Sequence, residues 1–401
     1  MTDPKIPVRN DIMQPEAGTG SRSIVMVLSG LAAGGTEHVV NMLATTWSRR
    51  GHHVTVISPD NPDTPSYYGY PEGILLVRLG VPSRREFPLR AFLSTGRRLA
   101  RLRKAIKAAE PDIVLSFLTR MNVLTLLATR GLEIPVIVSE RNNPAVQKVG
   151  FLWNWLRAKL YPLAFGHVTM TAAARDYFSE AIRAKTRVIP NAVDLPSHWT
   201  PRRGGNLLVA VGRLVQMKGF DMLLEAFAEI APRFPDWKLI IWGEGPLRKQ
   251  LEAQRDRLGL QSQVLMPGVT ERPGMWIETA DVFVLSSRYE GWGLVVLEAM
   301  AAGIPVVAFP CDFGPREMIV DGIDGLFARR EDPRDLANKL SLVLTDAGLR
   351  QRMGQAAKRS VERFAPDKVI SLWDEIVAAA LATSSRAAKI ERAVARPRAY
   401  R

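Results

Sequence analysis

Two carboxylates separated by a glycine-containing turn have the types and spacing to hold a sugar joined to a diphosphate. Glu290 and Glu298 lie eight residues apart in SSRYEGWGLVVLEAM, with Gly291 and Gly293 between them. A carboxylate accepts hydrogen bonds from hydroxyls, so Glu298 can hold a ribose and Glu290 a second sugar. Bare glycine amides before a helix attract a phosphate. The alternative is a solvated loop carboxylate and an ordinary helix-surface carboxylate.

Two cations earlier in the chain can supply charge for the same ligand. Arg213 and Lys218, in LLVAVGRLVQMKGF, stand at the end of an apolar run and at the start of a helical pattern. From these positions both can reach one diphosphate through charge-assisted hydrogen bonds. As an isolated pair, they can equally be two solvated surface cations.

Two glycine-containing turns follow other apolar runs. Glu244, in GEGP, is either a carboxylate at a helix start or a ligand contact. Gly34 and Gly35, in LSGLAAGGTEHVV, let the backbone approach a phosphate or a sugar, or form a plain strand-to-helix turn. Their spacing does not fit the GxGxxG dinucleotide fingerprint.

Short apolar runs that alternate with helical patterns predict the elements that position these residues. The runs are residues 24–28, 53–57, 75–79, 112–117, 136–139, 167–171, 207–211, 238–242, 263–266, 282–286 and 306–309. They are rich in Val, Ile and Leu and do not alternate with polar residues, as is typical of parallel strands covered on both faces. The pattern predicts a doubly wound α/β fold whose ligands bind beyond the carboxyl ends of the strands.

Length and composition predict two such domains. A chain of 401 residues exceeds the size of one hydrophobic core, and the sequence at 191–205 is rich in Pro, Gly and charge. With Cys311 as its only cysteine, the chain has no intrachain disulfide. No run reads as a transmembrane helix or a signal peptide, so a cytoplasmic protein is expected. Residues 1–200 hold 25 Lys and Arg against 15 Asp and Glu, which favours an anionic partner.

The motifs, taken in the order in which they occur along the chain, resemble those of the retaining glycosyltransferases of family 4, which have the GT-B fold. The resemblance rests on Arg213 with Lys218, on GEGP, on Glu290 with Glu298, and on GIPVV at 303–307. It covers nearly the whole chain from residue 24 to about 365, and GGTE at 34–37 and IPNAVD at 189–194 fit the family's N-terminal loop and linker.

The resemblance implies two Rossmann-like parallel-sheet domains that face an interdomain cleft. It places a leader at 1–21, an acceptor-binding domain at 22–190, a linker at 191–205, a nucleotide-sugar-binding domain at 206–365, a helix that returns to the first domain at 366–383, and a basic tail at 384–401. The sequence does not indicate an oligomeric state.

The resemblance also implies roles for the site residues. Arg213 and Lys218 would bind the diphosphate, Glu298 the ribose and Glu290 the transferred sugar. The donor would also meet Gly34, Gly35, Glu244, Val269 near the base, and the backbone of Gly291, Trp292, Gly293, Leu294 and Val295. Trp292 is the residue expected to shape the choice of sugar. The family uses no metal bound to a DxD triplet, and no such triplet is conspicuous, so neither a metal nor another cofactor is expected.

The acceptor side is predicted from the sequence after the run at 136–139. Glu140, Arg141 and Asn142, in SERN, resemble the relatives that extend lipid-diphosphate-linked sugars, although many relatives have a histidine near the transferred sugar. The group is either an acceptor-sugar site or a polar loop that closes a strand.

Two further segments predict contact with a membrane. Residues 84–110 form a basic amphipathic helix that includes Arg97, Arg98 and Arg101, and residues 149–165 interleave aromatic and basic side chains. Both can lie at the cytoplasmic face of a membrane, around a polyprenyl-diphosphate acceptor, because anionic lipid attracts cations. The alternatives are a solvated helix face and an aromatic segment packed in the core.

These observations predict a peripheral-membrane glycosyltransferase that moves a hexose or N-acetylhexosamine from a nucleotide-sugar to a lipid-linked glycan. A UDP-sugar is favoured and a GDP-sugar is possible. One alternative is a nucleotide-sugar epimerase on the same fold, which would need no acceptor or membrane surface. A basic nucleic-acid-binding protein is the other alternative, but no stacking platform or recognised module for nucleic acid is visible, so no nucleic-acid partner is expected.

Overall fold

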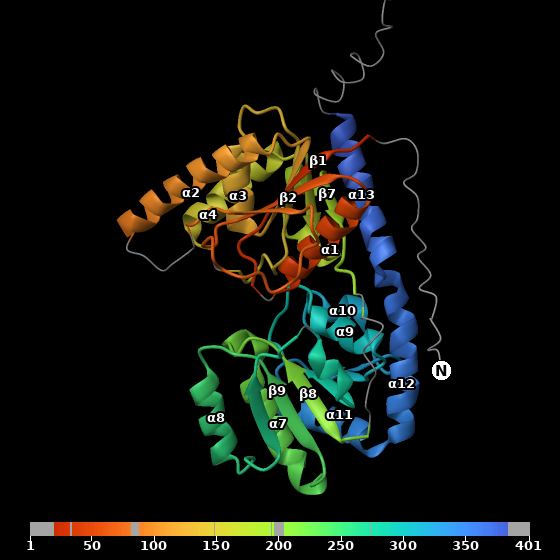
Figure 1. The fold of residues 1–401 in the computed structure, drawn as a ribbon. Coiled ribbons are helices and arrows are strands. Elements are labelled where there is room, and N and C mark those ends of the chain that lie inside the picture. Colours follow the sequence, from red (N-terminus) through yellow and green to blue (C-terminus); the bar gives the residue numbers. More distant parts are fainter. Residues whose placement is uncertain are drawn as a thin grey trace, which may run out of the picture. The chain divides into compact units, whose positions relative to one another are not determined.

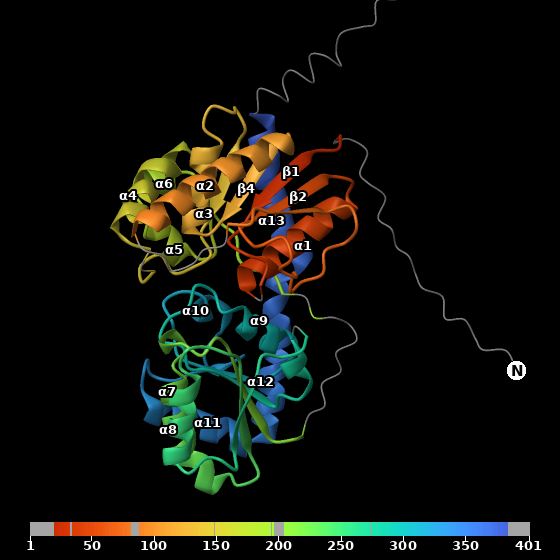
Figure 2. The ribbon, with the colours of Figure 1, turned by 60° about the vertical axis from the view of Figure 1, so that its left-hand side comes forward.

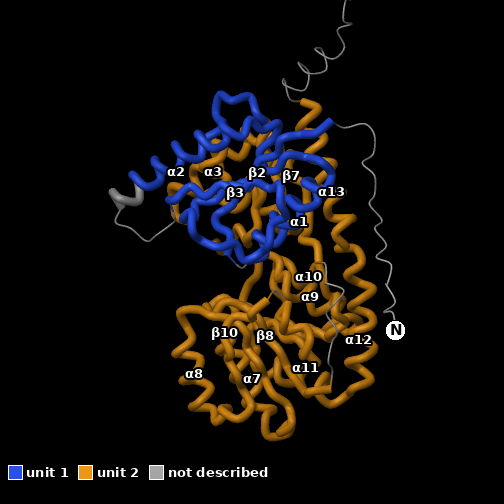
Figure 3. The backbone as a smooth tube through the Cα atoms, viewed as in Figure 1, with its two compact units in different colours: residues 1–115, 127–134, 384–401 blue, residues 116–126, 135–383 orange. Residues whose placement is uncertain are grey.

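The computed structural model describes most of the chain. The described residues are 20–32, 34–81, 88–147, 149–193, 195, 204–272 and 274–383. The predicted basic tail, the leader up to residue 19, and residues 194 and 196–203 of the predicted linker lie outside them. The described chain forms two compact units, one reaching Leu115 and including Leu127–Ile134, the other made of Ser116–Leu126 and Pro135–Thr383 (Figure 3).

A seven-stranded sheet is formed by the first half of the chain. Its order is β3-β2-β1-β4-β5-β6-β7, and the recorded strand pairs are parallel. The strands are β1 (Ser23–Val27), β2 (His53–Ser58), β3 (Leu75–Arg78), β4 (Ile113–Phe117), β5 (Val136–Ser139), β6 (Gly166–Thr169) and β7 (Thr186–Val188). Every residue of β4 and β5 is buried, whereas the edge strands β3 and β7 are partly exposed, as expected of a sheet covered on both faces.

A six-stranded sheet is formed by the second half, in the order β10-β9-β8-β11-β12-β13. Its strands are β8 (Leu207–Val211), β9 (Lys238–Trp242), β10 (Val264–Gly268), β11 (Val282–Leu285), β12 (Val306–Ala308) and β13 (Leu326–Phe327). The recorded pairs are again parallel. The direction of winding reverses between β8 and β11, so the loops that follow these two strands flank the place where doubly wound sheets bind ligands.

Helices connect the strands (Figure 1). They are α1 (Gly35–Arg49), α2 (Pro88–Ala108), α3 (Thr119–Ala128), α4 (Phe151–Leu160), α5 (Ala172–Asp176), α6 (Glu180–Arg183), α7 (Phe220–Ile230), α8 (Arg248–Arg257), α9 (Leu294–Ala301), α10 (Pro315–Met318), α11 (Pro333–Thr345), α12 (Ala347–Ser360) and α13 (Pro366–Ala382). In the second sheet, α7 and α8 lie on one side of the strands and α9 on the other (Figure 2). Separate apolar clusters, which include Phe227 of α7 and Leu297 of α9, fill the two sides.

The long helix α13 follows the second sheet in sequence but packs against strands of the first. The ring of Trp373 lies 5.9 Å from that of Phe117 at the end of β4. Ile376 lies so close to Gly166 in β6 that an added Cβ would stand 2.9 Å from its Cδ1. None of the described helices is both long enough and apolar enough to cross a membrane.

Candidate functional site

The loops after β8 and β11 are held together where the winding reverses. Gly219, in the left-handed region at φ +62°, lies so close to β11 that an added Cβ would stand 2.0 Å from the Ser286 carbonyl oxygen. The Ser286 hydroxyl donates to the Lys218 carbonyl over 2.9 Å. The Arg288 backbone N–H donates to the Met217 carbonyl over 2.8 Å. Only glycine allows this approach, which fixes Lys218 beside the loop that carries Glu290.

Lys218 and Glu290 form a buried ion pair. Their Nζ and Oε1 atoms are 2.6 Å apart, and the side chains are 13% and 6% exposed. The Ser287 hydroxyl donates to the same Oε1 over 2.6 Å. The structure thus brings together two residues, 72 positions apart in the chain, that were predicted to contact the two ends of a sugar diphosphate.

Arg213 lies in the same loop as Lys218, just after β8, and its side chain is exposed. An added Cβ at Gly212, its neighbour, would stand 3.0 Å from Cε of Lys218. The structure records no side-chain partner for Arg213 among the described residues. Its contact with a diphosphate that Lys218 also binds stays a prediction.

The loop after β9 packs directly on the loop after β8. An added Cβ at Gly243 would stand 1.9 Å from the Gly212 carbonyl oxygen, and one at Gly245 would stand 2.4 Å from the Leu214 carbonyl oxygen. The Leu214 N–H donates to the Glu244 carbonyl over 2.9 Å. The glycines of GEGP therefore serve the contact between two strand ends.

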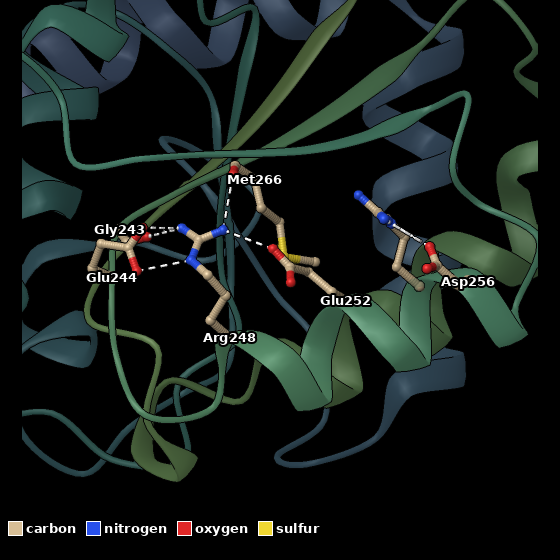
Figure 4. A network of polar contacts seen from close by, with 7 residues as sticks. Gly243, Glu244, Arg248, Glu252, Asp256 and Met266 are labelled. Atoms are coloured by element: carbon tan, nitrogen blue, oxygen red, sulfur yellow. Dashed lines mark hydrogen bonds and ion pairs between the residues drawn. The ribbon is translucent and has the colours of Figure 1, made fainter.

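The Glu244 side chain belongs to an ion network at the start of α8 (Figure 4). Arg248 donates to its carboxylate from Nε and Nη2, and also reaches Glu252 and the carbonyls of Gly243 and Met266. The hydrogen bonds from Arg248 lower the pKa of Glu244, which is exposed. The helix-start interpretation of Glu244 accounts for these contacts, and its role as a donor contact stays a prediction.

Glu298 lies one turn inside α9, which begins at Leu294 after Gly293 in a left-handed conformation at φ +90°. Burial raises the pKa of Glu298 to about 7. The structure records no side-chain partner for this carboxylate within the described part of the chain. A carboxyl group held in this way can accept hydrogen bonds from a ligand hydroxyl.

Other predicted donor contacts lie in different surroundings. Trp292 is 3% exposed, and its indole packs edge-on against Phe364 in the apolar cluster beneath the loop. Leu294 and Val295 are half-buried in the first turn of α9, and Val269, just after β10, is exposed. These positions make Trp292 a core residue of the loop, and its proposed influence on the choice of sugar stays a prediction.

The predicted N-terminal loop lies at the start of α1. Gly34 precedes the helix with extended backbone at φ −179°, and Gly35 is its first residue. The carboxylate of Glu37 folds back over Gly34, where an added Cβ would stand 2.2 Å from its Oε2. Burial raises the pKa of Glu37. The helix N-terminus is therefore already covered by a carboxyl group of its own first turn.

Glu140 is buried at the end of β5 and does not face solvent. It accepts hydrogen bonds from the hydroxyls of Tyr161 and Thr119, the latter over 3.0 Å. Asn122 donates to the Tyr161 hydroxyl over 2.9 Å. Burial is the main reason why the pKa of Glu140 is raised, and the charge of Arg157 counteracts it in part. This network fixes the backbone that leads into Arg141.

The loop that follows Glu140 meets the loop that follows Glu290. An added Cβ at Gly291 would stand 2.9 Å from the Arg141 carbonyl oxygen and 3.0 Å from Cα of Asn142. Arg141 is 5% exposed, and its Nη2 donates to Oδ1 of Asn191. The predicted acceptor loop and the predicted sugar loop are therefore in contact.

The predicted basic helix, α2, uses some of its arginines within the fold. Arg98 is buried and donates from Nε to the Val81 carbonyl over 3.1 Å, and Arg101 donates to the Leu79 carbonyl over 2.6 Å. Arg97 is exposed. Of the three arginines predicted to meet the acceptor, two therefore hold the segment after β3. Residues 84–87 of the predicted helix lie outside the described residues.

The predicted aromatic segment has an exposed apolar surface. Phe151 is 88% exposed, Trp155 50% and Leu163 69%, and these residues lie in α4 and just after it. Trp153 instead packs beneath the guanidinium of Arg120, 5.5 Å from the ring centroid. The segment is therefore not a core-packed aromatic segment as a whole.

Sequence reasoning missed several residues of the site. Ser287 is three residues before Glu290, and this short separation is the sequence signal for the hydrogen bond from its hydroxyl to Glu290. Arg288 forms two hydrogen bonds of 2.8 and 2.7 Å with the Asp221 carboxylate and so ties the β11 loop to α7. Asn191 carried no sequence signal of its contact with Arg141, because the two residues are 50 positions apart. The part of the chain that the structure describes contains no group of three or more His, Cys, Asp or Glu side chains that could hold a metal ion.

Two sequence profiles account for most of the chain. The profile of Glycosyltransferase Family 4 matches residues 33–196, and that of Glycosyl transferases group 1 matches residues 196–360. The chain belongs to glycosyltransferase family 4. This confirms the predicted family, and with the two parallel sheets it confirms the predicted α/β fold of the GT-B type.

Relatives of this family 4 glycosyltransferase cover almost all of it. A Campylobacter jejuni protein is 27% identical over 363 residues, which cover 88% of this chain and 98% of that protein. It is named GalNAc-α-(1→4)-GalNAc-α-(1→3)-diNAcBac-PP-undecaprenol α-1,4-N-acetyl-D-galactosaminyltransferase. The amylovoran biosynthesis glycosyltransferase of Erwinia amylovora is 22% identical over 364 residues, covering 88% and 99%. Among solved structures, HepE of Anabaena in complex with UDP and glucose matches with a TM-score of 0.73 at 19% identity, covering 89% of this chain and 99% of that one.

Proposed function

We propose that this glycosyltransferase moves a hexose or N-acetylhexosamine, with retention of configuration, from a nucleotide-sugar to a lipid-linked glycan. The reaction would belong to the synthesis of a bacterial surface polysaccharide or glycan, at the inner face of the cytoplasmic membrane. The observation that carries the proposal is the buried Lys218–Glu290 pair where the winding of the second sheet reverses. A cation and a carboxylate at one strand edge match a ligand that has an anionic end and a hydroxyl-rich end.

The donor is proposed to lie across the loops after β8, β9 and β11. Arg213 and Lys218 would bind the diphosphate, Glu290 the hydroxyls of the transferred sugar, and Glu298 the ribose. The exposed side chain of Arg213 and the half-buried glycines Gly291 and Gly293 before α9 support this placement. HepE, a relative in fold, was solved with UDP and glucose, which makes a UDP-sugar the first donor to test.

In the proposed step, the bond between the sugar C1 and the diphosphate oxygen breaks while an acceptor oxygen bonds to C1 from the same face. The leaving diphosphate takes the acceptor proton, so no separate base is required. Negative charge grows on the diphosphate, and Arg213, Lys218 and the N-terminus of α9 would stabilise it. We therefore propose that transfer needs no metal.

The acceptor is proposed to enter beside Gly291, where the loop after β5 meets the sugar loop. The Campylobacter relative is named for an acceptor on undecaprenol, which supports a lipid-linked glycan here. The exposed side chains of Phe151, Trp155 and Leu163 support membrane docking, because a bilayer interface would cover this apolar surface.

The test is transfer of radiolabelled sugar from UDP-, GDP- and ADP-sugars to a polyprenyl-diphosphate-linked glycan, in buffer with EDTA. We expect a lipid-extractable product with one of these donors and the same anomeric configuration as the donor. Turnover of the UDP-sugar to its epimer without acceptor would instead identify an epimerase. Flotation with anionic vesicles tests docking: salt-sensitive binding is expected, and no binding at low salt would refute it.

A further inference from the structure

Arg141 has an unusual environment for a charged side chain. It is 5% exposed, and its Nε and Nη1 atoms are buried with no hydrogen-bond partner among the residues that the structure describes. Its recorded side-chain contact among the described residues is the neutral amide of Asn191. Burial alone, with no contribution from a nearby carboxylate, lowers the pKa of Arg141 to about 9. The guanidinium is therefore a buried cation without a counter-charge in the described part of the chain.

The neighbouring buried arginine shows how this fold balances a charge when the charge is structural. Arg157 is also 5% exposed, and its Nη1 has no hydrogen-bond partner among the described residues. Its Nη2, however, donates to the Tyr177 hydroxyl over 3.3 Å, its guanidinium lies over the rings of Tyr177 and Phe178, and its charge counteracts part of the rise in the pKa of Glu140. Glu140 is adjacent to Arg141 in sequence, yet its carboxylate bonds to Tyr161 and Thr119. The carboxylate of Glu140 therefore does not pair with Arg141, although it is the closest carboxylate in sequence.

An unpaired buried charge is costly, and the cost is offset when an ion of opposite sign binds. The planar guanidinium presents paired N–H donors that match the oxygens of a phosphate, whereas a neutral sugar hydroxyl would leave the charge unbalanced. Arg141 also lies at the right place, because its carbonyl oxygen and Asn142 contact Gly291, the residue after Glu290.

We propose that Arg141 binds a phosphate oxygen of a diphosphate substrate, and that Asn191 holds the guanidinium in position for it. This deepens the proposed function and rests on it, since the diphosphate belongs either to the nucleotide-sugar donor or to the lipid-linked acceptor. It replaces the predicted contact between Arg141 and an acceptor sugar by a contact with an anionic group.

Calorimetry with two pairs of probes separates the sources. UDP is compared with uridine for the donor, and farnesyl diphosphate with farnesol for the acceptor, on wild type, Arg141→Met and Arg141→Lys. We expect Arg141→Met to weaken one diphosphate probe by about tenfold to a hundredfold and to leave its neutral counterpart unchanged, as loss of a charge-assisted hydrogen bond would. Arg141→Lys should keep part of the affinity that Arg141→Met loses, because lysine retains the positive charge but lacks the paired N–H donors of the guanidinium.

Arg157→Met is the matched control, because it removes an equally buried arginine from the same region. It should leave the binding of both diphosphate probes unchanged but lower the melting temperature, since it deprives Glu140 of a compensating charge. Arg141→Met should not lower the melting temperature of the free protein, because it removes an unpaired buried charge. A melting temperature that falls as far in Arg141→Met as in Arg157→Met would contradict the unpaired state.

The outcomes distinguish this inference from the proposed function. If wild type binds neither diphosphate probe, both fail. If wild type binds UDP or farnesyl diphosphate and Arg141→Met binds each equally well, the inference fails and the proposed function stands. A loss that is equal for the diphosphate probe and its neutral counterpart would also overturn the inference, because it would indicate a general disturbance of the site.

Discussion

Removing the charge of Lys218 and of Glu290 should separate the effect of their ion pair on stability from its effect on catalysis. At 2.6 Å, two unit charges attract by roughly 6 kcal/mol at an effective dielectric constant of about 20. Most of this attraction offsets the cost of burying both charges. Removal of one partner leaves the other as a buried charge without a counter-charge, which lowers the free energy of unfolding by about 3 to 5 kcal/mol for a buried pair. Because Lys218 keeps 13% of its side-chain exposure, we expect a loss of about 3 kcal/mol for Glu290→Gln or Lys218→Met.

The double variant Lys218→Met/Glu290→Gln carries the decisive information. It leaves no stranded charge, so it should recover most of the lost stability, and the double-mutant cycle should give a coupling of about 2 kcal/mol or more. The melting temperature should fall by roughly 6 to 10 °C in each single variant. Sugar transfer should instead fall by about two orders of magnitude in all three variants, because each lacks a proposed contact to the substrate.

The pair formed by Arg272 and Glu278 is the matched control. Its atoms are also 2.6 Å apart, but the two side chains are 47% and 25% exposed. Its coupling should be about 1 kcal/mol or less, and its loss should not affect transfer. The reasoning about Lys218 and Glu290 is refuted if the double variant transfers sugar at nearly the wild-type rate, or if its two single variants lose no stability.

Three further changes test the geometry of the site. Gly219→Ala should cost about 3 kcal/mol or more in thermal unfolding, because its Cβ would lie 2.0 Å from the Ser286 oxygen at a positive φ; an unchanged melting temperature would contradict this. Gly291→Ala should reduce transfer more than stability, since its Cβ would press on Arg141 and Asn142; equal rates for variant and wild type would count against the contact. Because the folded pKa of Glu298, about 7, exceeds its ordinary value of 4.5, its contribution to stability is greatest below pH 4.5 and is lost as the pH rises to 7. Glu298→Gln should flatten this slope in melting temperature between pH 5 and 8, and an unaltered slope would contradict the burial.

The strand ends that carry the site could be predicted from the sequence. Uniform apolar runs such as residues 207–211 and 282–286 identify buried parallel strands, and chemistry is expected at their carboxyl ends. This is why the sequence by itself suggests that Lys218 and Glu290 lie near each other. The structure adds the reason why the two loops can approach, because the left-handed Gly219 permits a contact that no other residue allows.

The destinations of individual side chains could not be predicted in the same way. The amphipathic pattern of α2 marks Arg98 and Arg101 as cations, but it does not reveal that the carbonyls of Val81 and Leu79 accept their hydrogen bonds. Trp292 lies between two loop glycines, yet its ring packs against that of Phe364, which is 72 residues later in the chain. Such contacts depend on which distant segments of the chain lie nearby in the fold. The periodicity of one segment does not contain this information.

The contact between the two predicted binding loops illustrates the same limit. Local sequence predicts a ligand for SERN and a ligand for EGWG. Because about 150 residues separate the two segments, it does not indicate that Arg141 and Gly291 touch. Likewise, only the folded structure shows that two guanidinium nitrogens of Arg141 have no hydrogen-bond partner within the described part of the chain. Local sequence therefore predicts which residues carry charge, and the tertiary fold decides which of those charges are paired with another described residue.

The most direct test of the central claim is a calorimetric titration of a UDP-sugar into wild type and Lys218→Met, in buffer that contains EDTA. We predict that wild type binds the nucleotide-sugar without a divalent metal and that Lys218→Met binds it at least about tenfold more weakly. Equal affinity of the two proteins, or binding by wild type only after a divalent metal is added, would contradict a site in which protein cations hold the diphosphate.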